Sequence, residues 1–212
     1  AYMFAALIVI HSRSLKTRLY WLGGILVGYS LIQLLVPVPG IGAGVLTPEG
    51  CINGYIDRML LPGRLHGEIY DPEGLLCIVS ATAITLMGSV AGHILRNAGE
   101  NDNQKVIKLL IIGGSSIVLA LLLSSFYPII KKCWTSTFNL LAGGIGFVLM
   151  AVFYWIIDVK GWKKWAFFFR IIGLNSIFIY LLYGFINIGE VCSRFFGWTV
   201  LLGSIEPVIH TS

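Results

Sequence analysis

The feature that most constrains this chain is a series of apolar segments that are each about twenty residues long. They run at about Leu19–Val36, Leu75–Leu95, Val106–Phe126, Phe138–Ile157 and Ala166–Ile186. A helix rises about 1.5 Å per residue, so about twenty residues cross the ~30 Å hydrocarbon core of a bilayer. Segments with the strict alternation typical of a membrane β-barrel are absent from the sequence. The sequence therefore predicts an all-α, polytopic transmembrane helix bundle with five full spans.

Both ends of the chain carry shorter apolar stretches, which we interpret as partial helices. Ala1–Ile10 is followed directly by the polar stretch HSRSLKTR, and FGWTVLLGSIEPVIHTS at the other end resembles the approach to a further helix. A segment of about half a span does not cross a bilayer by itself. We therefore expect residues 1–212 to form a single transmembrane bundle that is the C-terminal part of a larger membrane domain.

The basic residues are divided unequally between the two ends of the expected spans. Ten of the 15 lysines and arginines fall at the end that carries HSRSLKTR, and five fall at the end that carries the loop over residues 37–73. The positive-inside bias predicts that the richer end is cytoplasmic and that loop 37–73 faces the periplasm or exterior. This distribution favours anionic lipid over nucleic acid as the partner. The sequence also lacks an N-glycosylation sequon, which favours a bacterial inner membrane.

The cysteines and histidines form no metal-binding or redox motif. Cys51, Cys77, Cys133 and Cys192 contain no CxxC pair, and all four fall at or close to the expected outer face. An oxidising compartment would permit a disulfide there, although four separate thiols are the simpler interpretation. Because no histidine has metal-ligand spacing to another, the sequence predicts no metal site.

Small residues recur four positions apart inside three of the spans. This spacing puts both residues on one helix face, where a second backbone can approach closely. The pairs are Gly24 with Gly28, Gly88 with Gly92, and Ala142 with Gly146. They predict tight helix packing and leave open whether it occurs within one protomer or across a homodimer.

The end of the expected outer loop carries acidic residues directly before the second span. Asp71 followed by Pro72 predicts a helix start, because aspartate caps free backbone amides and proline fits the first turn. Glu73 would then lie in the first turn at the membrane edge, where desolvation favours pairing or a raised pKa. A plain helix cap and a ligand-binding carboxylate both remain open for Asp71.

The same loop contains an adjacent acid and base in GYIDRMLLPGR. Asp57 and Arg58 could form an ion pair that holds the loop, or could take part in binding. Carboxylates and aromatic side chains together suit a cationic, polyhydroxylated ligand such as an amino sugar. The other residues of this kind in the loop are Glu49, Glu68 and Tyr70.

Two further polar stretches fall in or beside the spans. Asn175 and Ser176, in GLNSIFIY, lie about 15 Å into the fifth expected span, where a polar side chain bonds to another helix or lines a cavity. Trp134, in KKCWTST, precedes the fourth span. An interface anchor beside a Ser or Thr helix cap accounts for this stretch, and contact with a ligand is the alternative.

Several linked motifs carry a resemblance to a known family. They are VPVPG, GYIDRMLL, YDPEGLL, LMGSVAGHIL, KKCWTSTF, DVKGW and GLNSIFIY, in this order. Over about Leu19–Gly184 the chain resembles the C-terminal half of heparan-alpha-glucosaminide N-acetyltransferase and its bacterial homologues. The resemblance implies a multi-span enzyme that moves acetyl from cytoplasmic acetyl-CoA to the amine of a terminal glucosamine on the lumenal or outer side. It also implies a histidine in an H-x-x-W-like context; this sequence has no such motif, so we expect the catalytic histidine upstream of Ala1.

On this resemblance the polar residues receive roles. An acidic loop can hold the ammonium and hydroxyl groups of glucosamine, and a carboxylate can accept the proton that the amine loses before it attacks a thioester. The expected substrate-binding residues are Asp71 and Glu73 on the acceptor side, Asp57 and Arg58 as loop support, and Asn175, Ser176 and Trp134 as further contacts. The alternative is a transporter or flippase of a sugar or lipid-linked substrate, in which the same residues line a path. A structural partner subunit is a third interpretation.

Overall fold

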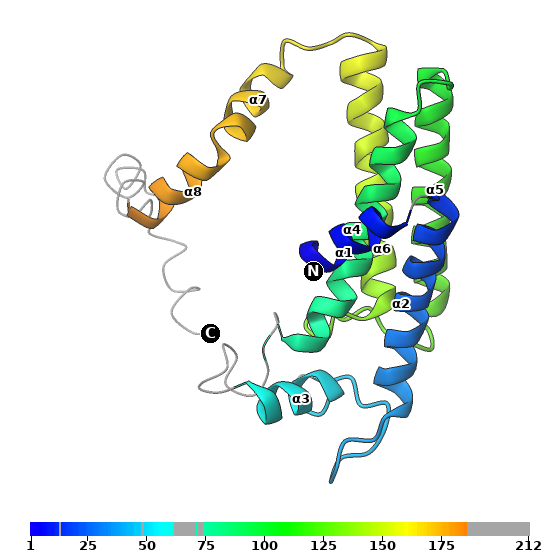
Figure 1. Ribbon diagram of the computed structural model, residues 1–212, viewed down its shortest axis with the longest axis vertical. Helices are drawn as coiled ribbons and strands as arrows, with labels where there is room; N and C mark the ends of the chain where they lie inside the picture. The colour runs from blue at the N-terminus through cyan, green and yellow to red at the C-terminus, as the bar shows by residue number, and fades with distance from the viewer. Residues whose placement is uncertain (13, 48, 62–70, 72–73, 186–212) are drawn as a thin grey trace, which may run out of the picture. The chain divides into compact units, whose positions relative to one another are not determined.

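The computed structural model describes residues 1–12, 14–47, 49–61, 71 and 74–185. They form helices in two compact units, Ala1–Lys160 and Gly161–Ser212 (Figure 1). The elements of the first unit are α1 (Tyr2–His11), α2 (Leu15–Leu35), α3 (Ile52–Leu60), α4 (Leu75–Arg96), α5 (Asp102–Leu123), α6 (Ser136–Tyr154) and the π-helical turn η1 (Trp155–Val159). Those of the second unit are α7 (Ala166–Leu174) and α8 (Ser176–Phe185). No strand occurs among the described residues, so the all-α prediction is confirmed for them.

Four helices of the first unit are long and apolar enough to cross a membrane. They are α2, α4, α5 and the continuous helix Ser136–Val159 formed by α6 and η1, with 21, 22, 22 and 24 residues. Large apolar side chains on them stay exposed, as Ile111 and Leu122 of α5 do. Such exposure suits contact with acyl chains, which are themselves apolar. The described part of the chain thus has the architecture of a helical membrane protein with four of the expected spans.

The fifth expected span differs from the prediction. Residues 166–185 form two short helices, α7 and α8, which are separated at Asn175. The Nδ2 of Asn175 donates to the carbonyl of Ile171 at 2.8 Å, and its backbone N–H bonds to the same carbonyl at 3.1 Å. Asparagine favours helix ends because its side chain competes for backbone groups. Apolar content alone overlooked this interruption, so five uninterrupted spans are not found in the described residues.

The tightest helix contact in the first unit joins α5 and α6. A Cβ on Gly113 would lie 2.8 Å from the carbonyl oxygen of Gly144, and a Cβ on Gly144 would lie 2.8 Å from that of Gly113. Neither position has room for a side chain, which is the arrangement that small residues permit in membranes. Beside this contact, Met87, Leu109 and Phe147 join α4, α5 and α6 in one buried apolar cluster.

The small-residue pairs expected from the sequence do not make this contact. A Cβ would meet no atom within 4 Å at any of the following positions: Gly24, Gly28, Gly88, Gly92 and Gly146. Close helix packing is confirmed within the protomer at other positions, and packing of the expected pairs across a homodimer stays a prediction. The backbones of α5 and α6 approach each other at Gly113 and Gly144, which lie on different helices. The spacing rule considers only pairs of small residues on the same helix.

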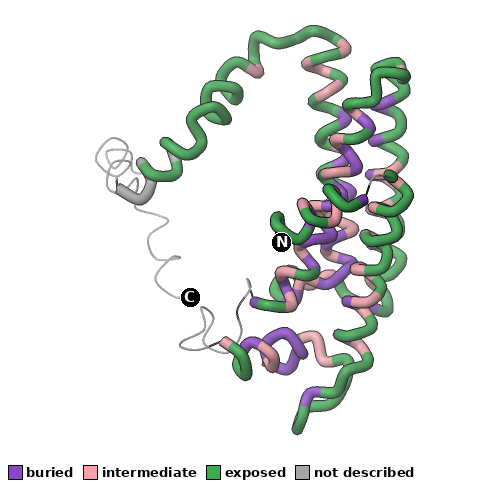
Figure 2. The backbone as a smooth tube through the Cα atoms, in the orientation of Figure 1, coloured by how far each residue is buried: buried purple, intermediate pink, exposed green. Residues whose placement is uncertain are grey.

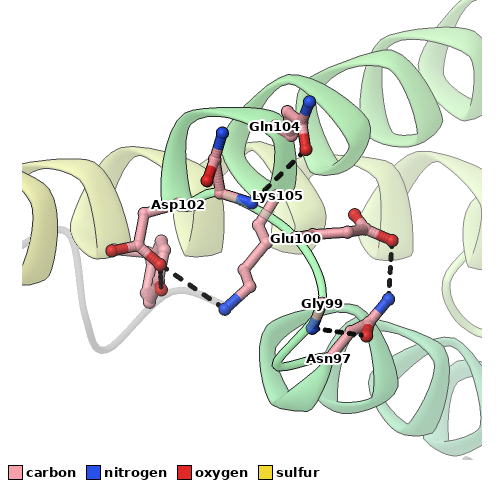
Figure 3. Close-up of polar contacts among 8 residues, drawn as sticks. Asn97, Gly99, Glu100, Asp102, Gln104 and Lys105 are labelled. Carbon is pink, nitrogen blue, oxygen red and sulfur yellow. Dashed lines mark hydrogen bonds and ion pairs between the residues drawn. The ribbon is translucent and has the colours of Figure 1, made fainter.

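Polar residues fix the connection between α4 and α5 (Figure 3). Asn101 and Gln104 form a capping box at the start of α5, which satisfies free amides of its first turn. Glu100 accepts a hydrogen bond from Asn97 Nδ2 at 2.6 Å, and its Oε1 lies 2.7 Å from Lys108 Nζ. The Lys108 ammonium holds the pKa of Glu100 below its usual range. This connection and α3 lie at opposite ends of α4.

Candidate functional site

A cluster of buried polar side chains lies at the end of the first unit that carries α3, and Figure 2 shows that part of α3 itself is buried. Gln33 of α2 donates from Nε2 to Asn53 Oδ1 of α3 at 2.9 Å and to the backbone carbonyl of Cys133 at 2.8 Å. Tyr29 donates to the same carbonyl at 2.8 Å and accepts from Asn53 Nδ2 at 2.6 Å. Tyr127 donates to Gln33 Oε1. We call Tyr29, Gln33, Asn53, Tyr127 and the Cys133 carbonyl the α3-end cluster.

The α3-end cluster fastens elements that are far apart in the sequence. It joins α2, α3 and the connection between α5 and α6, and each of its residues is buried. Burial raises the pKa of Tyr127 to about 12, so this phenol stays protonated and remains a donor at neutral pH. A buried polar group that loses its partner costs about 1–3 kcal/mol. The cluster therefore holds α3 against α2 and the connection between α5 and α6.

A second buried contact joins α4 to α6 beside this cluster. Asn139 donates from Nδ2 to Ser80 Oγ at 2.6 Å and to the Ser80 carbonyl at 3.0 Å. The Ser80 hydroxyl in turn donates to the carbonyl of Trp134 at 2.6 Å. The Oδ1 of Asn139 is buried and has no hydrogen-bond partner among the described residues. This oxygen can accept a hydrogen bond from a ligand or from a water molecule.

Asp57 of α3 lies against the start of α4. Its Oδ1 accepts a hydrogen bond from the backbone N–H of Leu75 at 3.0 Å, and the residue is fully buried. Gly74 makes this approach possible, because a Cβ there would lie 1.9 Å from Asp57 Oδ2. The carboxylate thus satisfies one of the free amides of the first turn of α4 from a different helix.

The environment of Asp57 disfavours its charged form. Burial raises the pKa of this carboxyl group, and the hydrogen bond from the Leu75 amide opposes that rise. The negative charge of Asp71 nearby raises it further. The Oδ2 of Asp57 has no hydrogen-bond partner in the described part of the chain. A carboxyl group in these surroundings can take up or release a proton closer to neutral pH than an exposed aspartate.

The acidic residues expected to start the second span are placed differently. α4 begins at Leu75. Its N-cap residue is Gly74, which has no side chain that could cap the helix. Asp71 is therefore not the N-cap residue of α4, as one of its two interpretations expected, and Asp57 supplies an acceptor for the first turn. The carbonyl of Asp71 accepts from the Gly74 N–H at 3.1 Å, so Asp71 still lies beside the start of α4. Glu73, Glu68 and Tyr70 lie outside the described residues.

Arg58 and Trp134 lie at the same end of the unit. Arg58 is exposed and donates from Nη2 to the backbone carbonyl of Glu49 at 3.3 Å, whereas Asp57 beside it is buried against α4. Trp134 is half-buried, has a positive φ of 49°, and packs edge-to-face on Phe138 with 5.7 Å between ring centroids. The helix cap expected beside it is confirmed, since the side chain of Thr135 accepts from the Phe138 N–H.

Asn175 and Ser176 belong to the second unit. Both are exposed there, and the amide of Asn175 is bonded within α7 as described above. The structure thus brings Asp57, Arg58, Asp71 and Trp134 to one end of the first unit. That Asn175 and Ser176 bind the same substrate as these residues stays a prediction.

The sequence analysis missed the residues of the α3-end cluster. Gln33 and Asn139 carried the available signal, because an amide inside an apolar span needs a partner within the protein. Tyr29 and Tyr127 gave no such signal, since tyrosine is common near membrane interfaces. No group of three or more His, Cys, Asp or Glu side chains in the described ranges is arranged to hold a metal ion.

Two curated proteins are similar to the chain, and no family model matches it. Heparan-alpha-glucosaminide N-acetyltransferase of Homo sapiens is 30% identical over 76% of this chain and 28% of its own length. The enzyme of the same name from Mus musculus is 31% identical over 71% of this chain and 27% of its own length. The chain thus spans less than a third of the length of the curated relatives it matches.

Proposed function

Because the chain belongs to the family of heparan-alpha-glucosaminide N-acetyltransferase, we propose that it is part of a membrane acetyltransferase. In this proposal acetyl-CoA is the acetyl donor and the amine of a glucosamine-type sugar is the acceptor. The observation that carries the proposal is the similarity to two such enzymes over about three quarters of the chain. The four apolar helices support it, because they fit an enzyme that works within a membrane.

We place the acceptor at the α3 end of the first unit. Asp57, Asp71 and Trp134 meet there, and the buried oxygens of Asp57 and Asn139 that lack a partner among the described residues lie at the same end. The division of basic residues in the sequence supports an exterior or periplasmic position for this end, in a bacterial inner membrane. Acetyl-CoA would then bind from the cytoplasmic side.

The residues of this end would act on the acceptor amine. Asp71 and Glu73 would hold the ammonium group and accept its proton, with Asp57 and Arg58 supporting the loop that carries them. Trp134 would contact the sugar, and Asn175 and Ser176 of the second unit stay predicted substrate-binding residues. The free amine then attacks the acetyl carbonyl. In direct transfer a C–N bond forms, the C–S bond of the thioester breaks and the CoA thiol leaves; in transfer through an acetylated histidine the CoA thiol leaves first and the amine then displaces the histidine. We assign the family's histidine to a part of the protein outside residues 1–212. In this proposal, residues 1–212 and that part form the active site together.

An acetyl-transfer assay tests this proposal. Full-length protein in detergent would be incubated with acetyl-CoA and glucosamine, and formation of acetylglucosamine and free CoA thiol would be measured together. We expect product with the wild type and a loss of at least tenfold in kcat/KM with Glu73→Gln. The matched control is Glu206→Gln, which removes an acid from the C-terminal segment rather than from the acceptor loop.

Two outcomes would contradict the proposal. Folded protein that forms no product with a panel of amino sugars would favour transport, which the buried amides of Gln33 and Asn139 inside apolar helices also suit. Substrate counterflow in liposomes without acetyl-CoA would then identify a transporter or flippase. Equal loss in Glu73→Gln and Glu206→Gln would show that the effect is not specific to the acceptor loop.

A further inference from the structure

The structure places three buried cysteines at the α3 end, and the side chains of two of them contact each other. Cys51 and Cys133 are joined by a side-chain hydrogen bond, although they lie in distant parts of the sequence. Cys51 is 2% exposed and Cys133 is 0% exposed. Cys51 is the N-cap residue of α3, and Cys133 lies in the connection that precedes α6. Neither thiol has a part in the proposed acetyl transfer.

The backbones of both cysteines are held in place without the help of their sulfur atoms. The N–H of Cys51 donates to the Thr47 carbonyl at 2.8 Å. The carbonyl of Cys133 accepts from Tyr29 and from Gln33, each at 2.8 Å. A disulfide forms easily only where the two Cα and Cβ positions already suit it, since deviations store strain. The hydrogen bond between the two side chains brings their sulfur atoms together, and the backbone bonds hold both cysteines at this place.

The third thiol at this end is engaged differently. Cys77 of α4 accepts a hydrogen bond from Asn53 Nδ2 at 3.2 Å, and its Sγ lies 4.0 Å from the Asp71 carbonyl. Cys133 instead lies 3.4 Å from the carbonyl of Leu46 through its Sγ, beside its contact with Cys51. The polar partners of Cys77 differ from those of the other two thiols. The contacts therefore select one pair out of the three cysteines.

We propose that Cys51 and Cys133 form a disulfide that ties the start of α3 to the connection between α5 and α6. The proposal places the α3 end in an oxidising compartment, because disulfides persist in such compartments and are rare in the cytosol. It does not depend on the acetyltransferase activity.

The chemistry needs an external disulfide as the oxidant, for example oxidised glutathione. The hydrogen bond between the two thiols lowers the pKa of Cys51 and raises the pKa of Cys133, so Cys51 is the attacking thiolate. Its sulfur attacks the oxidant and releases one glutathione thiolate. Cys133 then loses its proton, attacks the Cys51 sulfur of the mixed disulfide and releases the second glutathione. Two protein thiols are oxidised, and one glutathione disulfide is reduced to two thiols.

Peptide mapping of the full-length protein tests the proposal. Trypsin cleaves after Arg18, Arg58, Arg64, Arg96, Lys132 and Lys160, so it places the three cysteines in separate peptides, 19–58, 65–96 and 133–160. The protein would be incubated in detergent with oxidised or reduced glutathione, denatured, alkylated and digested. We expect peptides 19–58 and 133–160 to be joined after oxidation and to separate after reduction. The thermal unfolding midpoint should rise by several degrees on oxidation, because the cross-link restricts the unfolded chain.

Variants provide the matched comparison. Cys77→Ser should keep the link between 19–58 and 133–160, whereas Cys51→Ser and Cys133→Ser should abolish it together with the rise in the unfolding midpoint. Full alkylation of both thiols in oxidised wild-type protein would overturn the proposal, and so would a link from peptide 65–96 to either of the others. The mapping of the wild type decides the question even where a serine variant fails to fold.

Discussion

The carboxylate of Asp57 on α3 accepts a hydrogen bond from the backbone N–H of Leu75, the first residue of α4, at 3.0 Å. The two residues are 18 positions apart in the sequence, so the contact brings together the end of α3 and the start of α4. The first turn of a helix has free amides that need acceptors, and α4 takes one of these acceptors from α3. The contact thereby fixes where α4 begins and where the acidic loop returns to the bundle.

Gly74→Ala tests the space that this contact requires. The added methyl group would lie 1.9 Å from Asp57 Oδ2, so either the carboxylate or the start of α4 must shift. We expect a loss of about 1–3 kcal/mol in the free energy of unfolding, as for other overpacked sites. Thermal unfolding in detergent measures it. The matched control is Gly92→Ala on the same helix, where a Cβ meets nothing within 4 Å and the stability should stay equal or rise. Equal midpoints for both variants would contradict the close contact.

The raised pKa of Asp57 predicts a pH dependence of stability. A carboxyl group whose pKa is higher in the folded state than in the unfolded state contributes most to stability below its unfolded pKa of about 3.9. That contribution is lost as the pH rises through the folded pKa. Asp57→Asn keeps an acceptor oxygen for the Leu75 amide and removes the titration. The variant should therefore gain stability relative to the wild type as the pH increases from about 4 to 7.

A second variant at this position separates the titration from the cap. Asp57→Ala removes the acceptor of the Leu75 amide, so it should cost about 0.5–2 kcal/mol at low pH, where the wild-type carboxyl group is neutral. Unfolding midpoints at several pH values give both effects. A difference between Asp57→Asn and the wild type that does not change with pH would show that the carboxyl group does not titrate in this range.

The contact between α5 and α6 gives a third prediction. A methyl group on Gly144 would lie 2.8 Å from the carbonyl oxygen of Gly113, which is backbone and cannot move aside cheaply. Gly144→Ala should therefore lower the free energy of unfolding by about 1–3 kcal/mol. Gly146→Ala lies on the same helix in open space and serves as the control. Two variants of equal stability would mean that the backbones do not approach as closely as described.

The sequence predicted the spans of the first unit because their signal is local. Apolar length determines whether a helix can cross a bilayer, and α2, α4, α5 and α6 with η1 each have this length. The interruption at Asn175 was missed because one polar residue changes the mean apolarity of a span very little. The close approach of Gly113 and Gly144 was missed for another reason, since it depends on which faces of two helices meet.

The candidate site could be predicted only in part, because its contacts join distant segments. The sequence indicated that Asp57 supports the loop and placed Asp71 near the start of α4. It offered Asp71 as the helix cap or as a ligand-binding carboxylate, whereas in the structure an acid on α3 accepts from the first turn of α4. A local rule favours Asp71, and only the folded arrangement brings Asp57 to the Leu75 amide. The α3-end cluster was missed for the same reason, since Gln33 and Tyr127 meet only in the folded chain.

The α3-end cluster gives the last prediction. Tyr29→Phe removes the hydroxyl that donates to the Cys133 carbonyl and accepts from Asn53, and it should cost about 1–2 kcal/mol because Gln33 still bonds to that carbonyl. Tyr20→Phe, at a residue that is 79% exposed, should change stability by less than about 0.5 kcal/mol.

Combining Tyr29→Phe with Gln33→Leu shows whether the cluster acts as a unit. Residues of one hydrogen-bond network are expected to couple by about 0.5–3 kcal/mol in a double-mutant cycle, because each substitution weakens the contacts of the other. Thermal unfolding of the two single variants and the double variant gives this energy. Additive losses would mean that Tyr29 and Gln33 hold the Cys133 carbonyl independently. A coupling in the expected range would mean that α2, α3 and the connection before α6 are stabilised by one cooperative hydrogen-bond network.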